Sequence, residues 1–135
     1  MLGDKLGEEH GRITMRRVLP GQDYRYVQME ISIETEVTVL GVQGQNIGTY
    51  TVWERIPGQM YGEGQGIIMT ADGEGAIWNG HGIGHPTADG IAFAGSVAVQ
   101  TNSTKLARLN ECLMVVEHHA NNDGSAHSEL YEWKA

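Results

Sequence analysis

The sequence has one cysteine, little positive charge and no long apolar run, and each shortage excludes a class of protein. With Cys112 alone, no internal disulfide can form, so a disulfide scaffold is excluded and a reducing compartment is favoured. Nine basic residues stand against seventeen acidic ones, a net charge of −8, which would repel nucleic acids and anionic membranes. No segment has the roughly 18 consecutive apolar residues of a membrane span, and Met1–Lys5 lacks the apolar core of a secretion signal. We therefore expect a soluble, cytoplasmic protein with no nucleic-acid or membrane partner.

Glycine, by contrast, is abundant. More than half of the nineteen glycines lie between Gly58 and Gly95, interspersed with β-branched and aromatic residues. Because each glycine weakens a strand, repeated glycines are tolerated where backbones approach closely, bend or bulge. The pattern therefore predicts closely packed β-strands. At 135 residues the chain is expected to form one domain, 1–135, with residues 1–10 flexible.

Alternation of apolar and polar residues with period two recurs along most of the chain and predicts strands. Eight are expected: Arg12–Val18, Tyr26–Val42, Ile47–Ile56, Met60–Thr70, Glu74–Gly84, Ile91–Thr101, Glu111–His119 and Ala126–Trp133. The second is one long strand, or two if the chain bends near Thr35. Turns are predicted at Gly44–Asn46, at Asp72-Gly73 and at Asn122–Gly124, the last two as hairpin turns that favour positive φ.

One short helix is predicted between the sixth and seventh strands, at Ser103–Asn110. Ser103 or Thr104 can cap its start, Leu106 and Leu109 share one face, and Asn110 can close it. The fold class is all-β, and an eight-stranded antiparallel up-and-down barrel is favoured over a sandwich because closure removes exposed strand edges. Eight strands enclose an interior that side chains can fill or that can hold one small ligand.

The sharpest candidate site lies on the fourth and fifth strands. Tyr61, Glu63 and Gln65 share one face of the fourth strand, and glycines occupy the other. The Asp72-Gly73 hairpin brings this polar face next to Asn79 and His81. A carboxylate beside an imidazole suits general acid–base catalysis, so Glu63 and His81 are the candidate catalytic residues. In the alternative interpretation, the two form a solvated cross-strand pair on the outside.

Polar and aromatic residues on four strands are candidates to bind a ligand. Aromatic rings with polar tips are common in ligand-lined barrels, and also as ordinary core. The candidates are Tyr61, Gln65, Asn79, Trp53, Trp78, Tyr131 and Trp133.

No metal site and no cofactor are predicted. His81 and His85 share a strand face but stand about 13 Å apart along it, too far to chelate one ion. A site of His118, His127 and Glu129 across the last hairpin is a weaker alternative. A nucleotide loop is excluded, since Gly62–Gly66 lacks the Lys-Ser/Thr ending and residues 56–104 contain no Lys or Arg.

Tyr61-Gly62-Glu63-Gly64-Gln65-Gly66, taken with Lys105-Leu106-Ala107-Arg108-Leu109-Asn110, resembles small, largely uncharacterised bacterial proteins of the calycin or allene-oxide-cyclase-like barrel type. The resemblance extends from about residue 10 to the end of the chain. It implies a barrel whose lumen binds small hydrophobic ligands, as in calycins, or guides a ring closure with a glutamate and an ordered water, as in allene oxide cyclases. Glu63 matches that glutamate, whereas the lipocalin Gly-x-Trp signature is missing.

Three functions follow as hypotheses. In the first, the lumen binds a small, partly apolar, neutral or cationic molecule. In the second, the protein is an isomerase or cyclase in which Glu63, assisted by His81, moves a proton. In the third, the lumen is packed solid and the glycine-rich sheet face forms a homodimer or another protein interface. A deep pocket containing Glu63 would favour the first two, and an exposed Glu63 over an apolar lumen would favour the third.

Overall fold

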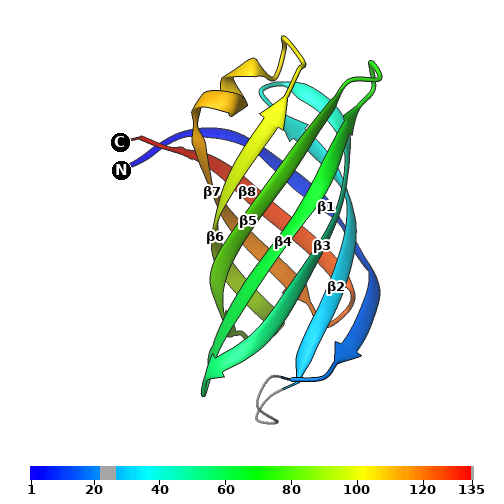
Figure 1. Ribbon diagram of the computed structural model, residues 1–135, viewed down its shortest axis with the longest axis vertical. Coiled ribbons are helices and arrows are strands. Elements are labelled where there is room, and N and C mark those ends of the chain that lie inside the picture. The colour runs from blue at the N-terminus through cyan, green and yellow to red at the C-terminus, as the bar shows by residue number, and fades with distance from the viewer. Residues whose placement is uncertain (22–26, 135) are drawn as a thin grey trace.

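Eight antiparallel strands close into a barrel in the computed structural model, which describes residues 1–21 and 27–134 (Figure 1). Each strand pairs with the next one in the sequence, and β8 pairs with β1. The strands are β1 (Leu2–Leu19), β2 (Gln28–Val39), β3 (Val42–Ile56), β4 (Gln59–Thr70), β5 (Gly75–Pro86), β6 (Gly90–Thr101), β7 (Leu113–Asn121) and β8 (Ser125–Trp133). The predicted eight-stranded up-and-down barrel is confirmed. Tyr26, with which the second strand was predicted to begin, lies outside the described residues.

The first strand begins at Leu2, so the prediction of a flexible segment 1–10 is wrong for Leu2–His10. This stretch joins the two ends of the sheet, because β1 pairs with β8 on one side and β2 on the other. Glycines hid the strand pattern in the sequence. A Cβ on Gly7 or Gly11 would lie 2.0–2.1 Å from backbone oxygens of β2, so these glycines allow the close approach of the two strands.

The hairpin between β2 and β3 turns at Leu40 and Gly41, and the predicted turn at Gly44–Asn46 is wrong. Leu40 and Gly41 have φ of 52° and 75°, as a tight two-residue turn requires. Leu40 is the only described non-glycine residue with positive φ, and its apolar character concealed the turn. Gly44 lies within β3, where a Cβ would stand 2.5 Å from the backbone oxygen of Met69.

The other two predicted hairpins are confirmed. Gly73 and Gly124 have φ of 82° and 90° in the turns that precede β5 and β8. The first of these turns sets the pairing of β4 and β5, in which Glu63 faces His81 and Gln65 faces Asn79.

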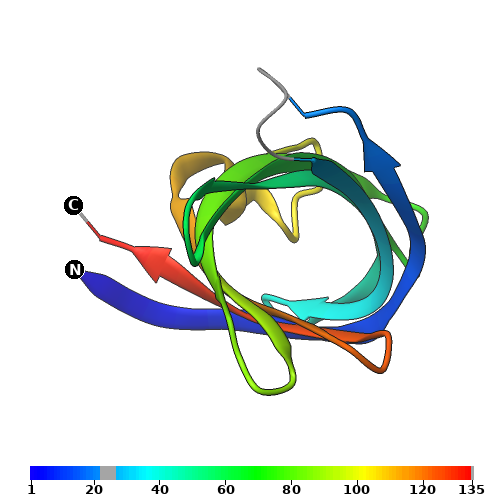
Figure 2. The ribbon, with the colours of Figure 1, turned by 90° about the horizontal axis from the view of Figure 1, so that it is seen from below.

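A short segment between β6 and β7, residues 102–112, lies at one end of the barrel (Figures 1 and 2) and is called the plug below. The predicted helix is a 3-10 turn, η2 (Ala107–Glu111), between β6 and β7. Leu106 and Leu109 are fully buried beneath it, as their shared face predicted. Ser103 Oγ accepts a hydrogen bond from the Leu106 N–H at 3.3 Å, and the Asn110 side chain bonds both the N–H and the C=O of Thr101.

The barrel interior has two apolar clusters. The cluster below the plug includes Val37, Val39, Ile68, Leu106 and Leu109. The cluster towards the other end contains the residues Ile31, Ile33, Val52 and Ala126. Buried polar side chains, Glu9, Thr35, Asn46 and Ser128, also project into the interior. These polar residues are the starting point for the site.

Over the described residues, no helix is long and apolar enough to cross a membrane.

Candidate functional site

The glycine-rich faces of β4 and β5 point into the barrel. Along β4 the even-numbered positions are the more buried, and Gly62 and Gly64 border the internal cavity. Along β5, Gly80 and Gly82 border the same cavity. Register pairs Gly62 with Gly82 and Gly64 with Gly80, which makes a patch of wall without side chains. The odd-numbered residues of both strands therefore project outward.

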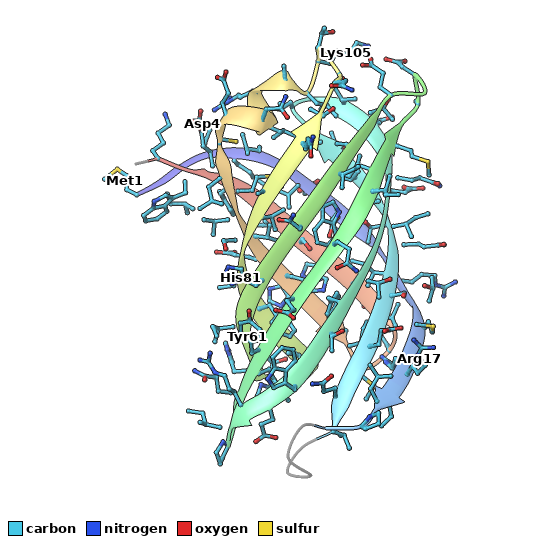
Figure 3. All side chains as sticks on the ribbon, viewed as in Figure 1. Met1, Asp4, Arg17, Tyr61, His81 and Lys105 are labelled. Atoms are coloured by element: carbon cyan, nitrogen blue, oxygen red, sulfur yellow. The ribbon has the colours of Figure 1, made fainter. Side chains whose placement is uncertain are left out.

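Glu63 and His81 do face each other across β4 and β5, but on the outer surface. Figure 3 labels His81 and Tyr61 of this group. Both side chains are exposed, as are those of Gln65 and Asn79. Glu63 accepts a hydrogen bond from Tyr61 Oη at 3.2 Å, and the Tyr61 ring stacks on His81 with centroids 6.2 Å apart. The expectation that this polar face lines the lumen is wrong. The rings of Trp78 and Phe93 lie inside the barrel against Gly66 and Gly84, so the glycine faces of β4 and β5 point inward.

Most of the aromatic candidates also lie on the outer face, and one lies inside. Trp53 packs on Tyr61 on the outer face, with ring centroids 4.8 Å apart. Tyr131 follows the buried Leu130 and therefore points outward, where its hydroxyl donates to Glu129 at 2.6 Å. Trp133 is exposed at the end of β8. Of the predicted ligand-binding residues, Trp78 alone projects into the barrel and borders the cavity.

The Trp78 indole lies flat against two glycines. A Cβ on Gly66 would stand 2.4 Å from Trp78 Nε1, and one on Gly48 would stand 2.6 Å from the six-membered part of the ring. These glycines provide the space that the indole occupies, as expected where a bulky ring meets backbone. Trp78 Nε1 donates to Asn46 Oδ1 at 2.7 Å, which joins the indole to the buried polar residues.

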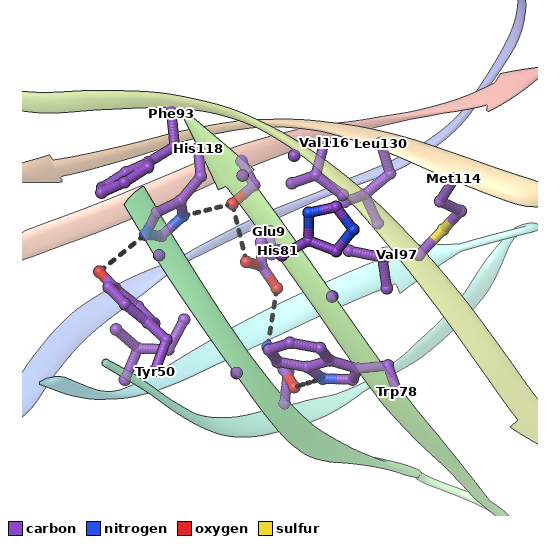
Figure 4. Close-up of a pocket in the computed structure, with 18 of the residues that line it drawn as sticks. Glu9, Tyr50, Trp78, His81, Phe93, Val97, Met114, Val116, His118 and Leu130 are labelled. Carbon is purple, nitrogen blue, oxygen red and sulfur yellow. Dashed lines mark hydrogen bonds between the residues drawn. The ribbon is translucent and has the colours of Figure 1, made fainter. Parts of the chain in front are cut away.

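A continuous chain of hydrogen bonds crosses the interior (Figure 4). Tyr50 Oη lies 3.1 Å from His118 Nε2, and His118 Nδ1 lies 2.8 Å from Ser128 Oγ. Ser128 Oγ donates to Glu9 Oε1 at 2.8 Å.

The other oxygen of Glu9, Oε2, accepts from Thr35 Oγ1 and Asn46 Nδ2, both at 3.0 Å. Both carboxylate oxygens are thus hydrogen-bonded inside the barrel. The chain therefore runs without a break from Tyr50 through Glu9 and Asn46 to Trp78.

Burial governs the acid–base properties of the Tyr50 end. Burial, together with a smaller effect of the nearby His119 and His127, lowers the pKa of His118 to about 4. The imidazole is therefore neutral at neutral pH. Burial also raises the pKa of the Tyr50 phenol well above its ordinary value. Both groups accordingly act as neutral hydrogen-bonding partners.

A cavity of about 120 Å³ lies inside the barrel, bordered by the glycines and the polar chain (Figure 4). Its size is close to that of cavities of about 150 Å³ that accept benzene. Among the described residues that line it there is no Lys or Arg. The side chains that face it include Ile33, Tyr50, Trp78, Phe93, Val97, Met114, Val116, His118 and Leu130. The space is mainly apolar, with a few polar atoms along the chain.

Comparison with known proteins gives likenesses in structure alone. A conserved protein of unknown function from Rhodopseudomonas palustris superimposes with a TM-score of 0.82 and 18% identity, covering 98% of this chain and 97% of its own. A protein of unknown function from Clostridium acetobutylicum gives 0.82 and 15%, with 97% and 98% covered. A β-barrel-like protein from Acinetobacter baumannii gives 0.83 and 15%, with 99% and 96% covered.

These likenesses show the fold. No protein-family model matches the sequence, and neither does any curated protein. At the identities given, the three structures establish the barrel over nearly the whole chain and transfer no activity to it.

Several residues of the interior site were not predicted from the sequence. Glu9 lies in the segment expected to be flexible, and Asn46 in a segment expected to be a turn. For His118 and Ser128 a signal existed. Each alternates with apolar or small residues, Met114, Val116 and Ala120 on β7 and Ala126 and Leu130 on β8, while Glu117 and Glu129 lie on the opposite faces. Following that alternation would have placed both side chains inside.

Within residues 1–21 and 27–134, no group of three or more His, Cys, Asp or Glu side chains is arranged to hold a metal ion. His119 and His127 stack with centroids 4.6 Å apart, so they meet across the last hairpin as paired rings.

Proposed function

We propose that the protein binds one small, mostly apolar molecule in the barrel lumen. The observation that carries the proposal is the cavity of about 120 Å³ between the glycine wall of β4 and β5 and the hydrogen-bonded chain from Tyr50 to Glu9. Apolar surroundings with a few placed polar atoms are typical of small-molecule sites. Calycins, which the sequence resembles, bind their ligands in the equivalent place.

The glycine wall supports this function over a solid barrel. Gly62 has room for a side chain, since a Cβ there would meet Phe93 at 3.4 Å and Val52 at 3.6 Å, both ordinary contacts. A larger residue at this position would have filled the lumen. The third hypothesis assumes a lumen packed solid, and the cavity argues against it. Its second assumption also fails, because the glycine faces point inward and are covered by the barrel itself.

The isomerase hypothesis loses its catalytic residue. Glu63, the proposed acid or base, is exposed on the outer face. The interior carboxylate is Glu9, and both of its oxygens already accept hydrogen bonds from Ser128, Thr35 and Asn46. Binding is therefore the function that the geometry supports best.

The test compares neighbouring substitutions on opposite faces of β4. Gly62→Val puts an apolar side chain into the cavity, whereas Glu63→Gln changes a side chain that is exposed on the outer face, at a position that also borders the cavity. A panel of fluorinated benzenes, phenols and anilines would be titrated into each protein and followed by ¹⁹F NMR. We expect wild type and Glu63→Gln to bind the same probes and Gly62→Val to lose them. Binding that survives Gly62→Val, or is lost in Glu63→Gln, would place the ligand elsewhere.

Native mass spectrometry of protein purified from cells provides a second test. One small molecule per chain, retained by Glu63→Gln and missing from Gly62→Val, would support lumen binding and give the ligand mass.

A further inference from the structure

The direction of the internal hydrogen bonds can be derived from one end. The Trp78 indole N–H can only donate, so the atom of Asn46 that it contacts must be the carbonyl oxygen. The amide nitrogen of Asn46 then faces Glu9 and donates to Oε2, which also receives the Thr35 hydroxyl hydrogen. This oxygen of Glu9 is therefore an acceptor whatever happens at the other one.

The bond between Glu9 and Ser128 determines the remaining directions. Glu9 Oε1 accepts the Ser128 hydroxyl hydrogen. Ser128 Oγ must then accept from His118 Nδ1–H, which leaves Nε2 of the neutral imidazole without a hydrogen. Nε2 accepts from the Tyr50 hydroxyl. Between Tyr50 and Glu9, every hydrogen of the chain thus points towards Glu9.

These directions determine what the Tyr50 hydroxyl can offer to a ligand in the cavity. With its hydrogen committed to His118, the Tyr50 oxygen offers only lone pairs. We infer that the ligand presents a hydrogen-bond donor, an uncharged hydroxyl or N–H group on an apolar body, to Tyr50 Oη, and that Glu9 imposes this choice from the far end of the chain. A ligand whose polar group is only a carbonyl, nitrile or carboxylate finds no donor there. This inference rests on the proposed function, since it concerns the same cavity.

Glu9→Gln provides a sharp test, because Asn46 and Thr35 dictate how the new amide must lie. Both donate to the Oε2 position, so the glutamine oxygen is held there and its NH₂ faces Ser128. Ser128 must then accept from the amide and donate to His118 Nδ1. The imidazole hydrogen moves to Nε2 and is donated to Tyr50, whose own hydrogen becomes free for the cavity. One nearly isosteric change reverses every hydrogen bond between Glu9 and Tyr50.

The first measurement needs no ligand. ¹⁵N-detected NMR of the His118 ring distinguishes the Nδ1–H from the Nε2–H tautomer. We expect Nδ1–H in the wild type and Nε2–H in Glu9→Gln, with Glu8→Gln as the control on an exposed neighbour. The Nε2–H tautomer in the wild type, or the same tautomer in wild type and Glu9→Gln, would overturn the inference.

The second measurement uses 4-fluorophenol, which can donate, and 4-fluorobenzonitrile, which can only accept. The wild-type protein is expected to prefer the phenol, and the ratio of the two dissociation constants should shift about 3- to 10-fold towards the nitrile in Glu9→Gln, the effect of one hydrogen bond. Glu8→Gln should leave the ratio unchanged. An unchanged ratio in Glu9→Gln, with both probes bound and both displaced by Gly62→Val, overturns the donor inference alone. If neither probe binds the wild-type protein, lumen binding is overturned, and this inference with it.

Discussion

Glu9 and Ser128 stand 119 positions apart in the chain and are joined by a 2.8 Å hydrogen bond inside the barrel. They are also directly paired in the register of β1 and β8, the two strands whose meeting closes the sheet. The polar chain thus crosses the seam of the barrel. The site therefore depends on the pairing of the two strands that close the barrel.

Glu9→Ala is expected to destabilise the protein strongly. Removing the carboxylate leaves buried donors on Ser128, Thr35 and Asn46 without an acceptor. Because each unsatisfied buried group costs about 1–3 kcal/mol, we expect a loss of about 3 kcal/mol or more in the free energy of unfolding. Urea denaturation measures it. Glu8→Ala, which removes exposed contacts with Lys5 and His10, should cost less than about 1 kcal/mol. Equal losses in the two variants would contradict the structure.

His118 should make the protein sensitive to acid. Burial lowers its pKa to about 4 in the folded state, against about 6.5 in the unfolded chain. Between these values the unfolded chain binds more protons, so the free energy of unfolding should fall as the pH drops from about 6.5 to about 4, by about 3 kcal/mol in total. Below about 4 the His118 contribution levels off.

The measurement for His118 is urea denaturation at a series of pH values for wild type and His118→Gln. Gln keeps hydrogen-bonding groups at this position but does not titrate. The difference in stability between the two proteins should therefore change with pH over this window. A constant difference would show that His118 titrates alike in the folded and unfolded chains.

The packing of the Trp78 indole on glycine predicts a larger loss of stability for substitution of Gly66 than of Gly62, although both lie on β4. In Gly66→Ala the new methyl group would lie 2.4 Å from Trp78 Nε1, so the ring must move and its bond to Asn46 is strained. We expect a loss of about 2 kcal/mol and a shift in Trp78 fluorescence. Gly62→Ala, with its nearest contact at 3.4 Å, should change stability by less than about 1 kcal/mol. The fluorescence is best recorded in a background without Trp53 and Trp133. An unperturbed Trp78 in Gly66→Ala would contradict this packing.

The plug should be energetically important. Leu109 is 1% exposed and packs in the cluster with Val39 and Met114. Leu109→Ala should lower the free energy of unfolding by about 2–5 kcal/mol, as expected for a large side chain removed from a core. Leu113→Ala provides the control, since Leu113 is 44% exposed and should cost less than about 1 kcal/mol. The midpoints of thermal denaturation of the two variants measure this difference. Similar midpoints would mean that the plug does not contribute to the core.

Local patterns predicted the strands where turn chemistry was explicit. The Asp72-Gly73 turn gave the antiparallel pairing of β4 and β5, but not its register. Counted as a two-residue turn it puts Gln65 opposite Gly80, whereas Thr70 bonds Glu74 across a three-residue loop and Gln65 therefore pairs with Asn79. The pattern failed where an unusual residue made the turn, as at Leu40, and where glycines concealed a strand, as at Gly7 and Gly11. In those places the backbone geometry is decided by contacts with a neighbouring strand.

The sequence by itself determined the fold class, the positions of most strands and the residues that share each strand face. Alternation with period two sorts residues into two faces but does not say which face is inside when one carries polar residues and the other glycines. Only the closed barrel decided that, because rings such as Trp78 fit inside only over glycines. Closure also brought Glu9 of the first strand to Ser128 of the last. Contacts between residues so far apart in the chain come from the closed sheet, and no local pattern encodes them.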